Sequence, residues 1–85
     1  MNITVETKFN IGDIVYTPLV YACWSPNSIP VQVTGVDVRY NISRGTQVLY
    51  MLTDTLGYMP EDMCFMSYEE CKQWCWEQNE KDGLL

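Results

Sequence analysis

Short runs of β-branched and aromatic residues, separated by turn residues, make up most of the chain before residue 67. These runs predict strands at Ile14–Thr17, Val31–Tyr40, Gln47–Thr53 and Tyr58–Pro60. Turns are expected at Gly12–Asp13, Asn41–Gly45 and Asp54–Gly57, and a loop at Ser25–Pro30. Strands this close together, joined by tight turns, are typical of an antiparallel sheet.

The second predicted strand changes its hydrophobic phase in the middle. Apolar residues stand at odd positions first and at even positions later: Val31 and Val33, then Val36, Val38 and Tyr40. Because side chains alternate between the faces of a strand, one extra residue at Thr34–Gly35 is needed to keep all these apolar side chains on the same face. We therefore expect a β-bulge or bend there, with Asp37 and Arg39 sharing the solvent face.

The third predicted strand carries apolar residues on both faces. One face holds Val48, Tyr50 and Leu52, and the other holds Leu49 and Met51. Strands covered on both faces show such continuous apolar runs. We therefore expect Gln47–Thr53 to be buried on both sides.

The last segment predicts a helix over about residues 67–82. Ser67 as N-cap and Glu70 three residues later form a capping box, and Gly83 follows as a C-terminal stop. The face toward the strands is expected to carry Tyr68, Cys71, Trp74 and Cys75. Trp76 falls off this stripe, nearer to Glu69, Lys72 and Glu80.

These elements predict a mainly β protein of the α+β class, as a single domain over residues 1–85. The strands lie within residues 1–66. The fold expected is a small SH3-like barrel or a strongly curved antiparallel sheet of about four to five strands, with one C-terminal helix.

Two motifs carry a resemblance. The opening places Phe9, Gly12, Asp13, Val15 and Tyr16 in the pattern F-x-x-G-D-x-V-Y. The closing run spans Tyr58–Phe65 and continues with Ser67, Glu69 and Glu70. Together they resemble small SH3-like proteins of phages and bacterial mobile elements, although the segment from Leu19 to Pro30 is longer than the usual connection. The resemblance implies a fold and a kind of genome, and it implies no catalytic residue.

Composition removes several function classes. The net charge of -6 argues against direct binding to nucleic acid, which requires basic residues, and against docking on an anionic membrane. The absence of His removes Ser-His-Asp and Cys-His catalysis. No signal peptide or membrane-spanning run is visible, so we expect a cytoplasmic protein.

The negative charge is confined to one end of the chain. Residues 1–53 carry three acids and three bases, whereas residues 54–85 carry eight acids and two lysines. One interpretation is a solubilising helix with pairs such as Glu77–Lys81. The other is an acidic surface for a basic partner, with its candidate residues at Glu69, Glu77, Glu80 and Asp82.

Aromatic residues are numerous, with three Trp and six Tyr in 85 residues. Trp24 and Trp76 are expected to be exposed and could anchor a partner, as exposed Trp often does. A groove lined by Tyr16, Tyr40, Tyr50 and Tyr58 is a further hypothesis. The alternative is that the aromatics fill a small core.

The chain has four cysteines: Cys23, Cys64, Cys71 and Cys75. Three interpretations of them are possible. Free thiols that pack in the core are favoured in a reducing cytosol. A four-sulfur zinc site and two disulfides are the less favoured interpretations. We therefore expect no cofactor.

No constellation predicts an enzyme, and the carboxylates Glu61 and Asp62 are interpreted as a solvated turn. Two functions remain as hypotheses. The first is a non-catalytic interaction module that binds a protein partner or a second copy of itself as a homodimer. The alternative is an acidic inhibitor that mimics nucleic acid and blocks a host nuclease or defence protein.

Overall fold

The computed structural model describes residues 6–20, 22–53 and 57–83. The described elements are β1 (Ile14–Val15), β2 (Pro18–Val20), β3 (Trp24–Pro26), β4 (Val31–Asn41), β5 (Gly45–Leu52), β6 (Tyr58–Pro60), the 3-10 helix η1 (Glu61–Met63) and α1 (Tyr68–Lys81). Residues 54–56 of the predicted turn at Asp54–Gly57 lie outside the described residues.

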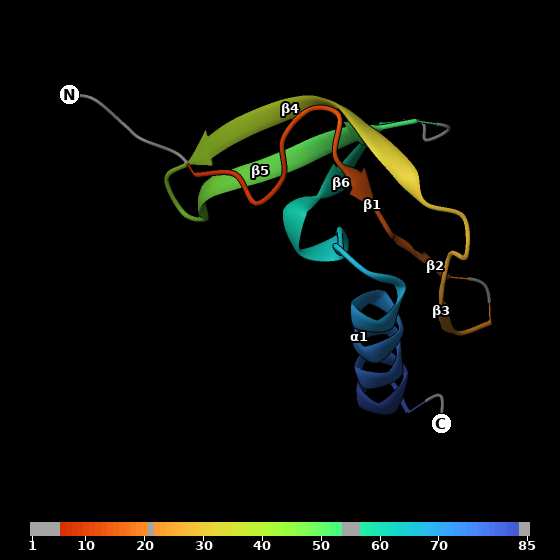
Figure 1. Cartoon of the computed structure of the whole chain (residues 1–85). Coiled ribbons are helices and arrows are strands. Elements are labelled where there is room, and N and C mark those ends of the chain that lie inside the picture. Colours follow the sequence, from red (N-terminus) through yellow and green to blue (C-terminus); the bar gives the residue numbers. More distant parts are fainter. Residues whose placement is uncertain (1–5, 21, 54–56, 84–85) are drawn as a thin grey trace.

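Four of these strands form a curled antiparallel sheet in the order β1-β4-β5-β6 (Figure 1). Within the described ranges β1 and β6 are the edges of this sheet, so it is a half-barrel and not a closed one. β2 and β3 pair separately as a two-stranded sheet beside α1. The predicted fold class, a strongly curved antiparallel sheet with a C-terminal helix, is confirmed.

The bulge predicted in the second strand is confirmed. The pairing of β4 with β5 shifts register between Val33 and Gly35, and the Thr34 hydroxyl donates to the Met51 carbonyl at 3.1 Å. The extra residue returns the later apolar side chains of β4 to the face that holds Val33. It also increases the local twist, which curls the sheet.

The expectation that Gln47–Thr53 is buried on both sides is wrong. Tyr50 and Leu52 are buried, whereas Met51 on the opposite face is 41% exposed and Leu49 is half-buried. The reason is the position of α1, which packs against β2 and β3 and leaves the outer face of β5 uncovered.

The expectation of a loop over Ser25–Pro30 is wrong at its start. Trp24–Pro26 is a strand that pairs with Pro18–Val20, and the two prolines face each other in this small edge pair. Proline is tolerated at sheet edges because no ladder hydrogen bond is needed there. The long segment after Pro18 therefore forms a hairpin that carries Trp24 to the helix.

The core has two parts. The first core cluster lies under the curled sheet: Phe9, Val15, Val31, Val33, Tyr50, Leu52 and Cys64. The second core cluster joins the helix to the hairpin: Phe65, Cys71 and Cys75, with Tyr16, Trp24 and Trp74 packed against them. Backbone hydrogen bonds between Tyr16 and Phe65, at 2.8 and 2.9 Å, connect the two clusters.

The helix begins and ends as the sequence predicts. The Ser67 hydroxyl accepts from the Glu70 backbone N–H at 3.2 Å, which is the first of the two capping-box bonds. Gly83 follows the C-cap residue with a φ of 72°, a left-handed conformation that glycine adopts without strain. Of the predicted stripe, Cys71 and Cys75 are buried and Trp74 is half-buried, whereas Tyr68 is 37% exposed.

Candidate functional site

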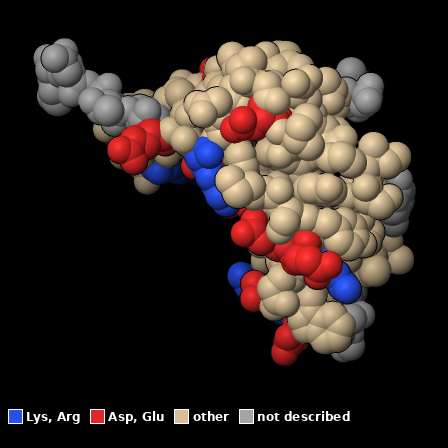
Figure 2. Space-filling model, in the orientation of Figure 1, with Lys and Arg blue, Asp and Glu red and all other residues tan. Residues whose placement is uncertain are grey.

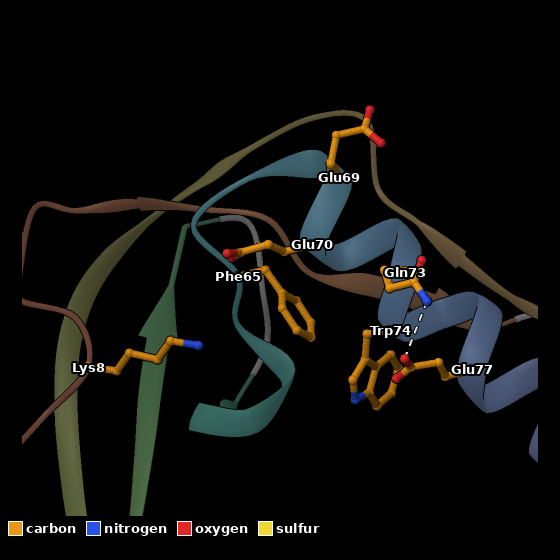
Figure 3. A pocket seen from close by; sticks show the side chains of 7 residues that line it. All are labelled: Lys8, Phe65, Glu69, Glu70, Gln73, Trp74 and Glu77. Carbon is orange, nitrogen blue, oxygen red and sulfur yellow. Dashed lines mark hydrogen bonds between the residues drawn. The ribbon is translucent and has the colours of Figure 1, made fainter.

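An open cleft of about 510 Å³ lies where the helix meets the sheet (Figure 3). We call it the acidic–aromatic cleft. It is lined by Lys8, Phe65, Glu69, Glu70, Gln73, Trp74 and Glu77. The segment before β1, the segment after η1 and the helix each contribute to it.

The aromatic walls of the cleft are held by packing on their far sides. The Trp74 ring lies 5.0 Å from that of Trp24 at nearly a right angle, and 5.9 Å from the Phe65 ring. Phe65 is fixed in turn by its backbone pairing with Tyr16. The two cleft rings are therefore positioned before any ligand arrives, which lowers the entropy lost on binding.

Three carboxylates line this cleft against one ammonium group. In Figure 3 Glu70 points toward Phe65, Glu77 lies beside Trp74 and accepts from the Gln73 amide at 3.3 Å, and Glu69 points away. Lys8 reaches in from the other side, with Nζ 5.9 Å from the Phe65 ring centroid. The cleft thus already holds a cation against an aromatic ring.

Among the described residues, the acids of the helix form no ion pair. In the part of the chain that the structure describes, the ion pair formed is Arg39–Asp37, and the expected Glu77–Lys81 pair is absent. Figure 2 shows red acidic side chains gathered along the helix end of the visible face, next to few blue ones. This side of the molecule therefore presents a negative field to a partner.

Trp24 is half-buried, so its expected exposure is wrong. It packs on Trp74, and the Asn79 side chain holds its backbone through two hydrogen bonds. The Trp24 N–H donates to Asn79 Oδ1 at 2.7 Å, and Asn79 Nδ2 donates to the Trp24 carbonyl at 2.8 Å. Sequence reasoning missed Asn79, although it lies four residues after Cys75 on the buried stripe.

Trp76 is 57% exposed on the solvent face of the helix, as expected. Glu80 is exposed as well. Asp82, just after the helix, accepts a long hydrogen bond of 3.4 Å from the Trp24 indole. Of the predicted acidic residues, the cleft brings together Glu69 and Glu77 and leaves Glu80 and Asp82 outside.

The predicted tyrosine groove is not formed. Tyr50 is buried in the first core cluster, and Tyr16 packs edge-on against Tyr68 at 6.1 Å. Tyr40 pairs with Thr46, whereas Tyr58 pairs with Met51 on the other face. Both are exposed, but the pairing register places Tyr40 and Tyr58 on opposite faces of the sheet.

All four cysteines are free thiols, and the side chains of Cys71 and Cys75 are hydrogen-bonded to each other. Cys71 and Cys75 lie in the second core cluster, Cys64 lies in the first, and Cys23 is exposed. Among the described residues no three metal-ligating side chains come together. Burial raises the pKa of the Cys64 and Cys71 thiols to about 12 and also raises the pKa of Cys75, which keeps these thiols protonated.

Glu61 ties the N-terminal segment to the sheet, so its interpretation as part of a solvated turn is wrong. It accepts from the Tyr50 hydroxyl at 2.5 Å and from the Lys8 backbone N–H at 3.0 Å. The Tyr50 hydroxyl also accepts from the Phe9 N–H at 3.0 Å. Burial, with the Glu61 hydrogen bond, raises the pKa of Tyr50 to about 12.

Among the described residues, no helix has the length and apolar character needed to cross a membrane. Comparison of the chain with protein-family models, with curated proteins and with solved structures finds no match. The carboxylates and aromatic rings of the acidic–aromatic cleft suit a cationic group.

Proposed function

We propose that the chain is a small, non-catalytic protein-interaction module that binds a basic segment of a partner protein. The observation that carries this proposal is the acidic–aromatic cleft, where the Trp74 and Phe65 rings lie between carboxylates. Trp is the aromatic side chain that attracts cations most strongly, and carboxylates add charge-assisted hydrogen bonds. An arginine side chain satisfies both, because its flat guanidinium stacks on a ring and donates to carboxylates at its edge.

The contact of Lys8 with Phe65 supports the same chemistry from within the chain. Its ammonium group lies over the Phe9 and Phe65 rings, at 5.5 and 5.9 Å from their centroids. Trp74, further along the cleft, has no such cation among the described residues. The proposed position of the partner's cation is therefore between Trp74 and the carboxylates of Glu70 and Glu77.

Binding of two matched peptides tests this proposal. Acetyl-Arg-Gly-Arg-amide is compared with the same peptide carrying citrulline, which keeps the shape but lacks the charge. Calorimetry at low salt is expected to show that the arginine peptide binds and that the citrulline peptide binds at least about tenfold more weakly. The affinity of the arginine peptide is expected to fall as the salt concentration rises. Equal affinity for both peptides, or none for either, contradicts the proposal.

Charge-neutral variants locate the site. Glu70→Gln and Glu77→Gln are each expected to weaken binding by about tenfold, because each removes a carboxylate that lines the cleft. Glu80→Gln removes the same charge from the same helix outside the cleft, and its effect is expected to stay within about twofold. If Glu80→Gln weakens binding as much as Glu70→Gln, the cleft is not the site.

A second candidate function is the acidic inhibitor that mimics nucleic acid, in a cytoplasmic protein of a phage or mobile element. It is favoured by the exposed acids along α1 that have no basic partner in the described chain. In a mimic of nucleic acid, carboxylates along the surface take the places of successive phosphates and each contributes to binding. Glu80→Gln and Asp82→Asn should then weaken binding to a basic nuclease as strongly as Glu77→Gln. If only the cleft variants lose binding, the result favours the interaction module.

A further inference from the structure

The outer edge of β4 is open over most of its length. β1 pairs with Val31 and Gln32, and Val33 exchanges backbone hydrogen bonds with Gly12 and Asp13 at 2.8 and 2.9 Å. Beyond that point, over residues 36–40, the backbone groups that point away from β5 have no hydrogen-bond partner in the described part of the chain. In Figure 1 this part of β4 is the upper border of the sheet.

The side chains along this edge alternate in a regular way. Val36, Val38 and Tyr40 are exposed to 36, 45 and 69%, and they share one face, because they pair with Tyr50, Val48 and Thr46. Asp37 and Arg39 point to the other face, where they form an ion pair at 2.7 Å. An open edge with exposed apolar side chains favours pairing with another strand.

The order of these residues makes the edge complementary to itself. In an antiparallel pair of two β4 strands centred on Val38, Val38 faces Val38, Val36 faces Tyr40, and Asp37 faces Arg39. The two-fold symmetry repeats each contact, so two apolar pairs and two opposite-charge pairs flank the central valines. Cross-strand pairs of both kinds stabilise a sheet.

Other registers of the same two strands are disfavoured. A shift of two residues toward the start of β4 places Asp37 opposite Asp37, and a shift of two toward its end places Arg39 opposite Arg39. A shift by one residue places apolar side chains opposite charged ones, because the side chains alternate with a period of two. Among registers within two residues of it, the sequence of this edge therefore favours the one centred on Val38.

The charge distribution permits this contact. Residues 1–53 have three acids and three bases, and the excess acids lie after residue 53. In Figure 1 the acidic helix α1 extends from the sheet on the side away from the open border of β4. Two copies joined at this edge therefore keep their acidic ends apart.

We propose that the chain forms a two-fold symmetric dimer by antiparallel pairing of β4 with β4 of a second copy, centred on Val38. The curled sheet then continues from one copy into the other. The dimer contact and the acidic–aromatic cleft use separate residues, so each can fail without the other.

Sedimentation equilibrium tests the proposal over chain concentrations from low micromolar to millimolar. The wild-type chain is expected to approach twice the mass of one chain. Arg39→Asp places two acids opposite each other, and Asp37→Arg places two arginines opposite each other. Each variant is expected to dimerise at least about tenfold more weakly, because two attractive pairs become repulsive.

An equimolar mixture of the two variants gives the sharpest result. One chain then presents two acids and the other two arginines, so a heterodimer is expected in the mixture at a concentration where each variant alone is mostly monomeric. Arg44→Asp is the matched control, since it makes the same charge change in the turn after β4, and it is expected to dimerise like the wild type. A mixture that stays monomeric contradicts the proposal.

Hydrogen exchange of the wild-type chain tests the same contact without any substitution. The outward-pointing amides between Val36 and Tyr40 are expected to become protected as the concentration rises, while the exposed turn around Arg44 is unchanged. A wild-type chain that is monomeric at every concentration, or a dimer that both charge variants retain, overturns the proposal.

Discussion

The sheet half and the helical half of this small chain are stabilised in different ways. The sheet half, built on the first core cluster, is stabilised by apolar packing around Tyr50. The helical half, built on the second core cluster, joins hairpin to helix through packed aromatic rings and the Asn79 side chain. Five acids and two lysines follow Phe65, so the short helical segment has the denser negative charge. The cleft therefore lies where an aliphatic core under the sheet meets an aromatic core under an acidic helix.

Alkaline pH should produce the largest effect and show which half unfolds first. The folded-state pKa is raised for Tyr50 and Cys64 in the sheet half and for Cys71 in the helical half, to about 12 in each case. Because the folded state favours the neutral forms, their contribution is complete below the ordinary pKa values of 9 and 10 and is lost as the pH rises toward 12. We expect unfolding to be complete near that pH.

Two optical probes follow this titration. All three tryptophans belong to the helical half, so their fluorescence follows it, whereas the ultraviolet absorbance of ionised tyrosine includes Tyr50. A fluorescence change that keeps pace with the absorbance change indicates one cooperative unit. A stability that does not fall between pH 9 and 12 contradicts the assignment of buried, neutral groups.

Removal of the Asn79 amide should weaken the helical half most. Asn79→Leu leaves the Trp24 N–H and carbonyl without partners at a half-buried site, and we expect a loss of about 3 kcal/mol in the free energy of unfolding. Urea unfolding followed by circular dichroism measures it. Gln73→Leu makes the same kind of change at an exposed helix position and should stay within about 0.5 kcal/mol. Equal effects of the two variants would mean that the Asn79 contact is not made.

Loss of the Tyr50 hydroxyl should have a smaller effect in the sheet half. Tyr50→Phe keeps the ring in the core and removes the hydrogen bonds to Glu61 and Phe9, for which we expect a loss of about 1–2 kcal/mol. Urea unfolding checks the value. Tyr58→Phe is the control, because this exposed hydroxyl has no hydrogen bond among the described residues. A Tyr50→Phe chain as stable as its control contradicts the role given to Glu61.

Thiol reactivity should show whether the core clusters of both halves stay closed in the native chain. Cys23 in the hairpin is exposed, whereas the thiols of Cys64, Cys71 and Cys75 are buried and have a raised pKa. Because the thiolate is the reactive form, a disulfide reagent near neutral pH should modify one thiol quickly in the native chain and all four in denaturant. Rapid modification of a second native thiol would show that one of the two clusters opens readily.

The elements with a local signal could be predicted from the sequence. The phase change before Val36 indicated the bulge, and Ser67 and Gly83 indicated the helix ends. The hairpin of β2 and β3 could not be predicted, because Pro18 and Pro26 locally favour a loop. Its contact with α1 outweighs that preference.

The candidate site was only partly predictable. Glu69 and Glu77 could be selected from the charge of the helix, and Trp74 from its stripe. Lys8 and Phe65 join the cleft through long-range pairing that no local pattern encodes. Tyr40 and Tyr58 look equivalent in sequence, and only the strand register separates their faces.

Nuclear magnetic resonance of the indole N–H groups can show whether the acidic–aromatic cleft binds a basic peptide. The three tryptophans give three resonances, and Trp76 on the same helix is an internal control outside the cleft. On titration with acetyl-Arg-Gly-Arg-amide, we expect the Trp74 resonance to shift in a saturable way while that of Trp76 stays in place. A shift of Trp76 with none at Trp74, or no shift at either, would rule out the cleft as the binding site.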